Sequence, residues 1–177
     1  MVAGPEGETS DRCMSYSFRE QLAIGQEQEA RLDRYWQSRF SITPATMEQQ
    51  RKGIDRIFTT RAGNVITVEY KADFKSHETG NAFVETVSVG RYNDDNEWTV
   101  EKHGWAVTSQ AEWLMYLVVA TGVLYITKPY IIRANMGNWE TACRSVTVKN
   151  SGYQGRGLLV PLKEFGSKCI KVIELED

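Results

Sequence analysis

Apolar positions near the start of the chain recur at steps of three and four residues, as one face of a helix requires. The stripe comprises Leu22, Leu32, Trp36 and Phe40. The surrounding segment lacks Pro and is rich in strong helix formers, so we expect one helix over residues 18–40. Glu29 lies on the same stripe, where a carboxylate is costly unless it is paired or binds a metal.

From residue 54 the apolar positions recur every second residue, which is typical of strands. Residues 54–59 and 65–71 predict two strands, joined by a hairpin turn over residues 61–64. The intervening segment before them, residues 41–52, contains Pro44 and is expected to be a connection. Residues 82–89 are rich in β-branched side chains and predict a third strand.

The next apolar run predicts a helix over residues 110–120, with Ser109 as its N-cap and Gly122 after its end. Residues 123–128 then predict a buried strand reached by a crossover. Beyond it, an appended hairpin or loop around a Gly-rich turn and a last strand form a β extension over residues 129–177. The core order helix, strand, strand, strand, helix, strand predicts an α/β (α+β) fold with a mixed central sheet flanked by helices.

Length and composition favour one globular domain. The 177 residues are 41% hydrophobic and 25% charged, values typical of soluble proteins. We expect a polar tail over residues 1–14 and a single domain over residues 15–177, with its core at about 18–128. The longest apolar run is too short to span a membrane and no secretion leader is visible, so an intracellular, cytoplasmic protein without a membrane partner is expected. The three cysteines have neither zinc nor disulfide spacing.

Charge is unevenly distributed along the chain. The net charge is −2, but residues 39–75 carry seven basic and four acidic groups, and residues 128–171 carry eight basic and two acidic groups. Residues 76–127 have two basic and seven acidic groups. Basic segments beside acids suit a polyanion held over metal ions, although such runs also occur as solvated faces.

Two acids and a lysine interrupt the predicted hairpin. Glu69 and Lys71 share one face of their strand, and Asp55 comes opposite them across the turn. Two carboxylates on a rigid sheet are hard oxygen ligands suited to Mg²⁺ or Mn²⁺, and a nearby amine can neutralise charge on a reacting phosphate. The alternative is a cross-strand ion network with Arg56, Lys71 or Lys75.

These residues resemble the PD-(D/E)xK nuclease superfamily, which has the restriction-endonuclease-like fold with an αβββαβ core. "GID" at residues 53–55 stands where that family has "PD", and "EYK" at 69–71 stands where it has "(D/E)xK". Ile54 replaces the Pro of the motif. The chain is also similar to small nucleases of phage and mobile elements, which implies a phage-encoded protein in a bacterial host as one possible origin.

The resemblance implies a Mg²⁺-dependent endodeoxyribonuclease in which Mn²⁺ substitutes for Mg²⁺. Asp55 and Glu69 would be metal ligands, Lys71 the catalytic lysine, and Glu29 the first-helix acid of the same metal site. Double-stranded or branched DNA would be the partner, cut by a homodimer. A catalytically inactive DNA-binding or interaction module, a structure-specific nuclease and an RNA-directed nuclease stay open as alternatives.

Further side chains are candidates for supporting roles. Asp73 and Glu85 could belong to a second shell around the metal, and Trp98 could stack on a base or a partner. Basic and amide side chains could hold phosphates near the cut, and they are Gln50, Arg51, Lys52, Arg56, Lys75 and Arg156. Arg156 lies in a Gly-rich loop suited to close approach to DNA, or to an ordinary hairpin turn.

Overall fold

A six-stranded mixed sheet forms the centre of the molecule. The computed structural model describes residues 18–150 and 152–175 of the chain. The strands of this sheet are β1 (Ser41–Pro44), β2 (Arg56–Thr59), β3 (Val65–Asp73), β6 (Trp113–Val118), β7 (Val123–Thr127) and β10 (Lys171–Glu174), and this is also their spatial order. Every neighbouring pair is antiparallel except β3 and β6, which run parallel.

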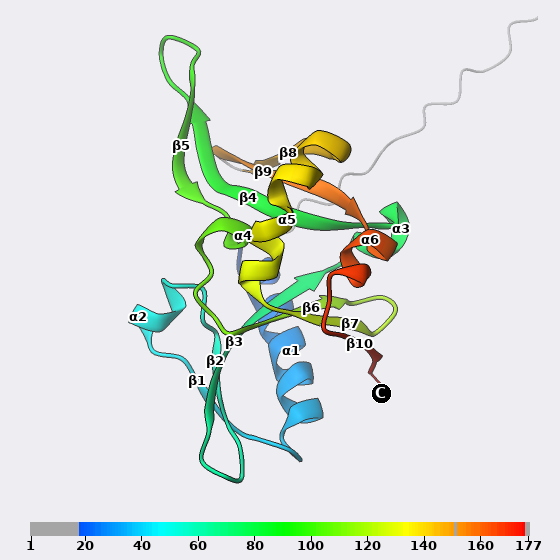
Figure 1. Ribbon diagram of the computed structural model, residues 1–177. Coiled ribbons are helices and arrows are strands. Elements are labelled where there is room, and N and C mark those ends of the chain that lie inside the picture. Colours follow the sequence, from blue (N-terminus) through cyan, green and yellow to red (C-terminus); the bar gives the residue numbers. More distant parts are fainter. Residues whose placement is uncertain (1–17, 151, 176–177) are drawn as a thin grey trace, which may run out of the picture.

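A second, four-stranded antiparallel sheet is built from chain inserted between β3 and β6 and from the C-terminal part. Its strands, in spatial order, are β5 (Trp98–His103), β4 (Asn81–Tyr92), β9 (Tyr153–Pro161) and β8 (Arg144–Asn150). The far end of the β4–β5 hairpin projects away from the rest of the chain and is exposed (Figure 1).

Helices cover both faces of the six-stranded sheet. The helices of the described residues are α1 (Phe18–Trp36), α2 (Met47–Gln50), α3 (Ser76–Thr79), α4 (Trp105–Thr108), α5 (Pro129–Ala142) and α6 (Leu162–Ser167). The long helix α1 packs on one face, where Leu32 and Trp36 join a core with Val68 and Tyr70 of β3. None of the described helices combines the length and apolar character needed to cross a membrane.

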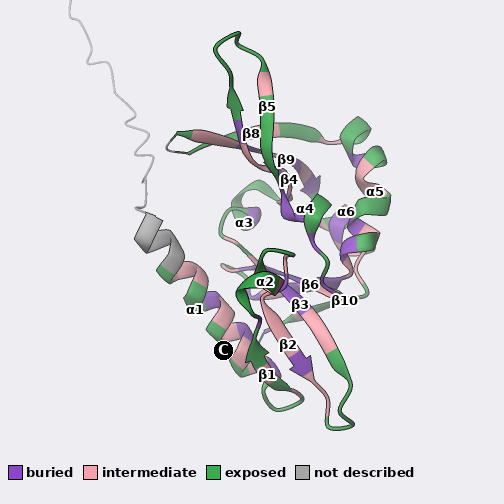
Figure 2. Ribbon diagram, turned by 90° about the vertical axis from the view of Figure 1, so that its left-hand side faces the viewer, coloured by how far each residue is buried: buried purple, intermediate pink, exposed green. Residues whose placement is uncertain are grey.

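The opposite face of the six-stranded sheet packs against the second sheet and three helices. Leu114, Tyr116 and Val118 of β6 point to this side, because alternate residues of a strand face opposite ways. They share a core with α5 and α6 and with β4 and β9. Figure 2 shows these buried positions in purple around α4 and α6. Residues of β3 that face the same way as these β6 positions therefore point toward the second sheet, and we call this the groove side because a cavity lined by Lys71 lies there.

The α/β class with a mixed sheet flanked by helices is confirmed, and so are the two strands around residues 60–64. The predicted helix over residues 110–120 is wrong, because Trp113–Val118 forms β6. Five of its six residues are fully buried, and a central strand buried on both faces has a continuous apolar run that periodicity does not separate from a buried helix.

Other predictions change as well. The predicted crossover to residues 123–128 is wrong, since β6 and β7 form a hairpin. The segment expected to be only a connection contains β1 and α2. The third predicted strand exists as β4 but lies in the second sheet. The C-terminal hairpin is not an appendage, because β9 pairs with β4 and β10 pairs with β7. The helix α5 was not predicted.

Candidate active site

The hairpin of β2 and β3 fixes Asp55 by its backbone. Arg56 pairs with Val68, and continuing this register by one step sets Asp55 opposite Glu69. The Asp55 N–H donates to the Val68 carbonyl at 2.8 Å, and one carboxylate oxygen accepts the Tyr70 N–H at 2.8 Å. Asp55 therefore lies beside the strand of Glu69, as predicted, and two hydrogen bonds to β3 hold it there.

Glu69 and Lys71 lie on the groove side of the six-stranded sheet. They neighbour Leu114 and Tyr116 of β6, which point to that side. Lys71 Nζ lies 2.9 Å from Glu69 Oε1, and the side chain of Glu69 is only 2% exposed whereas that of Lys71 is 32% exposed. The buried carboxylate of Glu69 is therefore paired with a lysine whose side chain is partly exposed.

The second oxygen of Glu69 has an open position. Oε2 is buried and accepts no hydrogen bond of good geometry from any described residue. Burial raises the pKa of the Glu69 carboxyl, and the nearby Ser109 hydroxyl opposes that rise only in part. A buried carboxylate oxygen without a donor is costly, and such atoms are rare in folded proteins. A cation is the natural partner for this oxygen.

Gly53 leaves the space beside that oxygen. Its φ of +72° is a left-handed conformation that favours glycine, and a Cβ built there would lie 3.0 Å from Ser109 Cα and 3.2 Å from Glu69 Oε2. The Ser109 hydroxyl donates to the Gly53 carbonyl at 3.4 Å, which ties the two segments together. Any side chain at residue 53 would crowd the open oxygen.

Glu85 of β4 approaches Lys71 from the second sheet. Its Oε2 accepts the Trp105 N–H at 3.4 Å. Burial raises the pKa of the Glu85 carboxyl, and the charge of Lys71 opposes this only in part. We call Asp55, Glu69, Lys71 and Glu85 the acid–lysine cluster. It joins one lysine to three carboxylates from both sheets.

The cluster shifts its own ionisation. Burial raises the pKa of Glu69, while Lys71 lowers it only in part. Burial alone would lower the pKa of the Lys71 amine, but the carboxylates of Glu69 and Asp55 outweigh burial and raise it, and Glu85 adds to the effect. Lys71 is therefore an ammonium at neutral pH, suited to holding negative charge and not to taking a proton.

Asp73 is occupied by hydrogen bonds. Its Oδ1 accepts the N–H groups of Lys75 at 2.7 Å and Ser76 at 2.9 Å, and its Oδ2 accepts the Tyr116 hydroxyl. Burial opposes the charge, but the bonds from Ser76 and Tyr116 outweigh it and lower the pKa of the Asp73 carboxyl. These contacts fix the turn into α3 and the end of β3, and they leave Asp73 a structural anchor beside the cluster.

The structure does not bring Glu29 to the predicted metal site. Helix α1 covers the face of the sheet opposite Glu69 and Lys71. Glu29 Oε2 instead lies 2.9 Å from Arg56 Nη2. The apolar stripe of α1 correctly placed Glu29 on the sheet-facing side, but the helix covers the other side of the sheet. Glu29 is therefore a partner of Arg56 and is not assigned to the acid–lysine cluster.

Arg56 is likewise unsuited to phosphate contact. Its side chain is only 14% exposed and bonds Asp33 through Nε at 2.9 Å as well as Glu29. The other candidates lie at the surface. Gln50 donates to the Ala45 carbonyl, and Lys52 and Lys75 pair with acids of their own helical turns. Arg51 is exposed.

Arg156 lies within β9, not in a loop, and stacks 3.7 Å over the ring of Trp98. Tyr92 meets the same indole edge to face. A Cβ at Gly90 would come within 2.2 Å of that indole, so glycine makes room for it. Trp98 thus stacks on an arginine of its own chain, away from the acid–lysine cluster.

Sequence reasoning missed Ser109 as a site residue. It was expected to cap a helix, whereas it stands just before β6 and packs against Gly53. A single serine in a polar turn carries no local signal of this role, because its position depends on the distant pairing of β3 with β6.

Comparisons with known proteins add little detail. No family model and no curated protein matches the chain. Among solved structures, a bacterial homing endonuclease, I-Ssp6803I, superposes with a TM-score of 0.46 and 18% sequence identity, over 67% of this chain and 74% of that one. A similarity of this size does not assign an activity.

The acid–lysine cluster offers a metal two carboxylate ligands. Among the described residues, no group of three or more His, Cys, Asp or Glu side chains is arranged to hold an ion. Mg²⁺ nevertheless often binds through one or two carboxylates and keeps several waters. Asp55 and Glu69, with the open Oε2 and the space left by Gly53, fit that pattern of two protein ligands.

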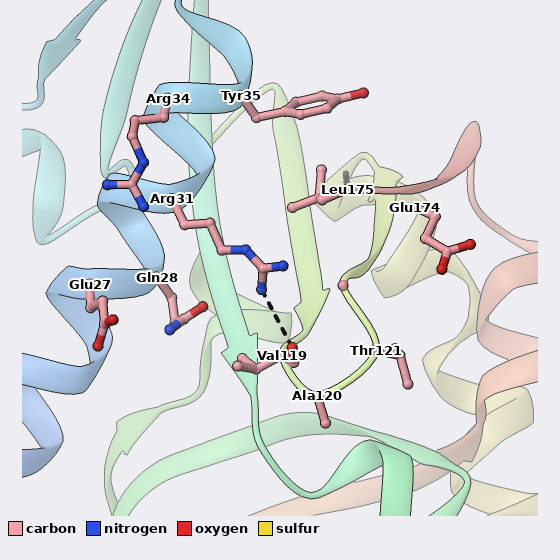
Figure 3. A pocket seen from close by; sticks show the side chains of 11 residues that line it. Glu27, Gln28, Arg31, Arg34, Tyr35, Val119, Ala120, Thr121, Glu174 and Leu175 are labelled. Atoms are coloured by element: carbon pink, nitrogen blue, oxygen red, sulfur yellow. Dashed lines mark hydrogen bonds between the residues drawn. The ribbon is translucent and has the colours of Figure 1, made fainter. Parts of the chain in front are cut away.

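A cavity of about 740 Å³ lies away from the acid–lysine cluster. It is bounded by α1, the β6–β7 turn and the C-terminal strand, and Arg31 donates there to the Val119 carbonyl at 3.4 Å (Figure 3). Its lining mixes the acids Glu27 and Glu174 with Arg31 and Arg34. No member of the acid–lysine cluster lines it. The size of a cavity therefore does not by itself identify the candidate active site.

Proposed function

We propose that the protein is a Mg²⁺-dependent nuclease that hydrolyses phosphodiester bonds in DNA at the acid–lysine cluster. The observation that carries the proposal is the buried Glu69 carboxylate, with one oxygen on Lys71 and the other without a donor, opposite a tethered Asp55. The local motifs "GID" and "EYK", which resemble those of PD-(D/E)xK nucleases, support the same reading.

The residues divide the chemistry between them. Asp55 and Glu69 would hold the metal, which when bound supplies positive charge that polarises a phosphate oxygen. The Lys71 ammonium is placed to donate to a non-bridging phosphate oxygen and to hold the charge that grows there as water adds to phosphorus. The bond from phosphorus to one ester oxygen then breaks, the attacking water gives up a proton to solvent, and the leaving oxygen takes one from solvent.

Removal of Lys71 tests the proposal. Lys71→Ala is expected to lower Mg²⁺-dependent cleavage of plasmid and linear DNA by at least about 100-fold, because it deletes the donor to the phosphate. Lys168→Ala is the matched control, since Lys168 also pairs with a glutamate, at 3.5 Å, and is 36% exposed. Equal cleavage by wild type and Lys71→Ala, with both folded by circular dichroism, contradicts the assignment.

A non-catalytic DNA-binding module is the second candidate. The 2.9 Å contact between Lys71 and Glu69 favours it, because the same pair would serve as a buried salt bridge. Calorimetric titration with Mn²⁺ separates the two functions. A nuclease is expected to bind Mn²⁺ and to lose that binding in Asp55→Ala, whereas a module binds DNA without a metal at Asp55.

Cutting both strands of a duplex requires two such sites, and each chain supplies one acid–lysine cluster. We therefore include a homodimer in the proposal. Sedimentation of the protein with a short duplex, together with the ratio of nicked to linear plasmid, tests it. Nicked product alone from a monomeric protein would remove the dimer and leave the chemistry intact.

A further inference from the structure

A cavity of about 420 Å³ opens directly from Lys71. It lies between the end of β3 with α3 and the sheet of β4, β8 and β9. Its apolar and aromatic lining includes Phe74, Phe83, Trp105, Tyr116, Val146 and Val148. Lys71 is the one member of the acid–lysine cluster that lines this cavity, so the two adjoin at that residue. We call it the Lys71 cavity.

One wall of the Lys71 cavity is fixed and flat. A Cβ at Gly157 would lie 2.4 Å from the ring of Phe83, so the ring lies against bare backbone of β9. The Phe83 N–H donates to the Tyr116 hydroxyl at 2.9 Å, which holds the start of β4 in place. An aromatic ring held in this way offers a surface on which a planar group can stack.

Two apolar side chains at the rim of the Lys71 cavity are exposed to solvent. Phe74 is 41% exposed and Val148 is 43% exposed, on opposite sides of the opening. Lys75, also lining it, is 76% exposed. The one carboxylate in the wall, Asp73, is already engaged by hydrogen bonds. The opening is thus apolar inside, and its lining carries two lysines, each paired with a glutamate.

We propose that the Lys71 cavity takes one unpaired nucleobase next to the phosphate that is cut. The inference rests on the proposed nuclease function and specifies its substrate class: nucleic acid with an unpaired nucleotide at the cut, as at an overhang, a bulge or a branch. Aromatic and apolar walls bind the faces of any base, while Lys71 and Lys75 attract the adjoining phosphates. A fully paired base would first have to leave its stack, which costs free energy.

Matched duplexes test the proposal by rate. One duplex is fully paired, and the other carries a single unpaired nucleotide beside the same phosphate. Wild type is expected to cut the second at least about tenfold faster. Phe74→Ser and Val148→Ser are expected to shrink that ratio. Val172→Ser, which changes a residue 46% exposed on β10, is the matched control and should keep the ratio. Equal rates on both duplexes by wild type overturn the inference.

Binding tests the proposal independently of cleavage. The Asp55→Asn protein is titrated with a DNA that carries 2-aminopurine as the unpaired base, because its fluorescence reports stacking. A change in fluorescence that Val148→Ser weakens supports the Lys71 cavity even if no DNA is ever cut, in which case only the nuclease function fails. An unchanged signal at saturating protein overturns the inference and leaves the nuclease function standing.

Discussion

The hairpin of β2 and β3 carries charged groups on both of its faces, and the two faces differ in how completely those groups are paired. On the α1 side, Arg56 bonds Glu29, Asp33 and the Asp55 carbonyl. Tyr70 donates its hydroxyl to Asp33 at 3.1 Å. On the groove side, Glu69 pairs with Lys71 through one oxygen and leaves the other unpaired.

The difference teaches how to separate an ion network that stabilises a fold from one that is available for chemistry. Both faces combine acids with one base at strand positions that alternate. Burial lowers the pKa of Arg56, yet Asp33 and Glu29 outweigh it and raise the pKa above its ordinary value, which leaves the guanidinium charged and bonded on several sides. The groove side keeps Glu69 Oε2 without a hydrogen-bond donor, and that oxygen is where we propose that the metal binds.

Removing one carboxylate from each face is the strongest test of the comparison. Asp55→Asn is expected to lower cleavage by at least about 100-fold, because a neutral amide is a poor metal ligand. Its fold should persist, since the amide oxygen can still accept the Tyr70 N–H. Asp33→Asn is expected to cleave like wild type while losing about 1 kcal/mol of unfolding free energy.

Cleavage rates with Mg²⁺ and urea unfolding curves measure both variants. The comparison breaks if Asp33→Asn loses activity as severely as Asp55→Asn does at equal folded fraction.

Two glycines at positive φ sharpen the comparison. Gly63, with φ +83°, has open space where a Cβ would be, whereas Gly53 has Ser109 and Glu69 there. Gly63→Ala is expected to cost about 1 kcal/mol of unfolding free energy through backbone strain alone and to leave cleavage unchanged. Gly53→Ala should cost more and should also weaken Mn²⁺ binding. Thermal unfolding and calorimetry report the two effects, and identical Mn²⁺ affinity in both variants would argue against a metal beside Glu69 Oε2.

The smallest expected effect concerns pH. Because the pKa of Glu85 is raised by burial, the folded chain binds its proton more tightly than the unfolded chain does. The stability from this group is present below the unfolded pKa, about 4.3, and is lost as pH rises through the folded pKa. Glu85→Gln mimics the protonated form, so it should raise stability at pH 7, within about 1 kcal/mol, and make little difference at pH 3.5.

Unfolding free energies across that range check the prediction. A stabilisation of equal size at both pH values would show that the carboxyl of Glu85 is not responsible.

Sequence was informative where neighbours along the chain decide the structure. The β2–β3 hairpin and the facing of Asp55, Glu69 and Lys71 follow from a turn and from strict alternation, both of which are local. It failed where distant segments decide. The run at Trp113–Val118 becomes a strand because β3 and β7 flank it, and Glu29 misses the site because helical periodicity does not say which face of a sheet α1 covers.

The parallel pairing of β3 with β6 also sets the order in which the molecule acquires its site. The β2–β3 hairpin closes over a short turn, an event of microseconds for isolated hairpins. Val68 meets Trp113 only after the whole excursion through β4, β5 and α4 has been closed, at a greater cost in chain entropy. Ser109 precedes β6 in the chain, so the pairing of β6 with β3 also brings Ser109 against Gly53. We therefore expect a newly made chain to carry Glu69 hydrated beside its hairpin until β6 pairs with β3 and encloses the carboxylate.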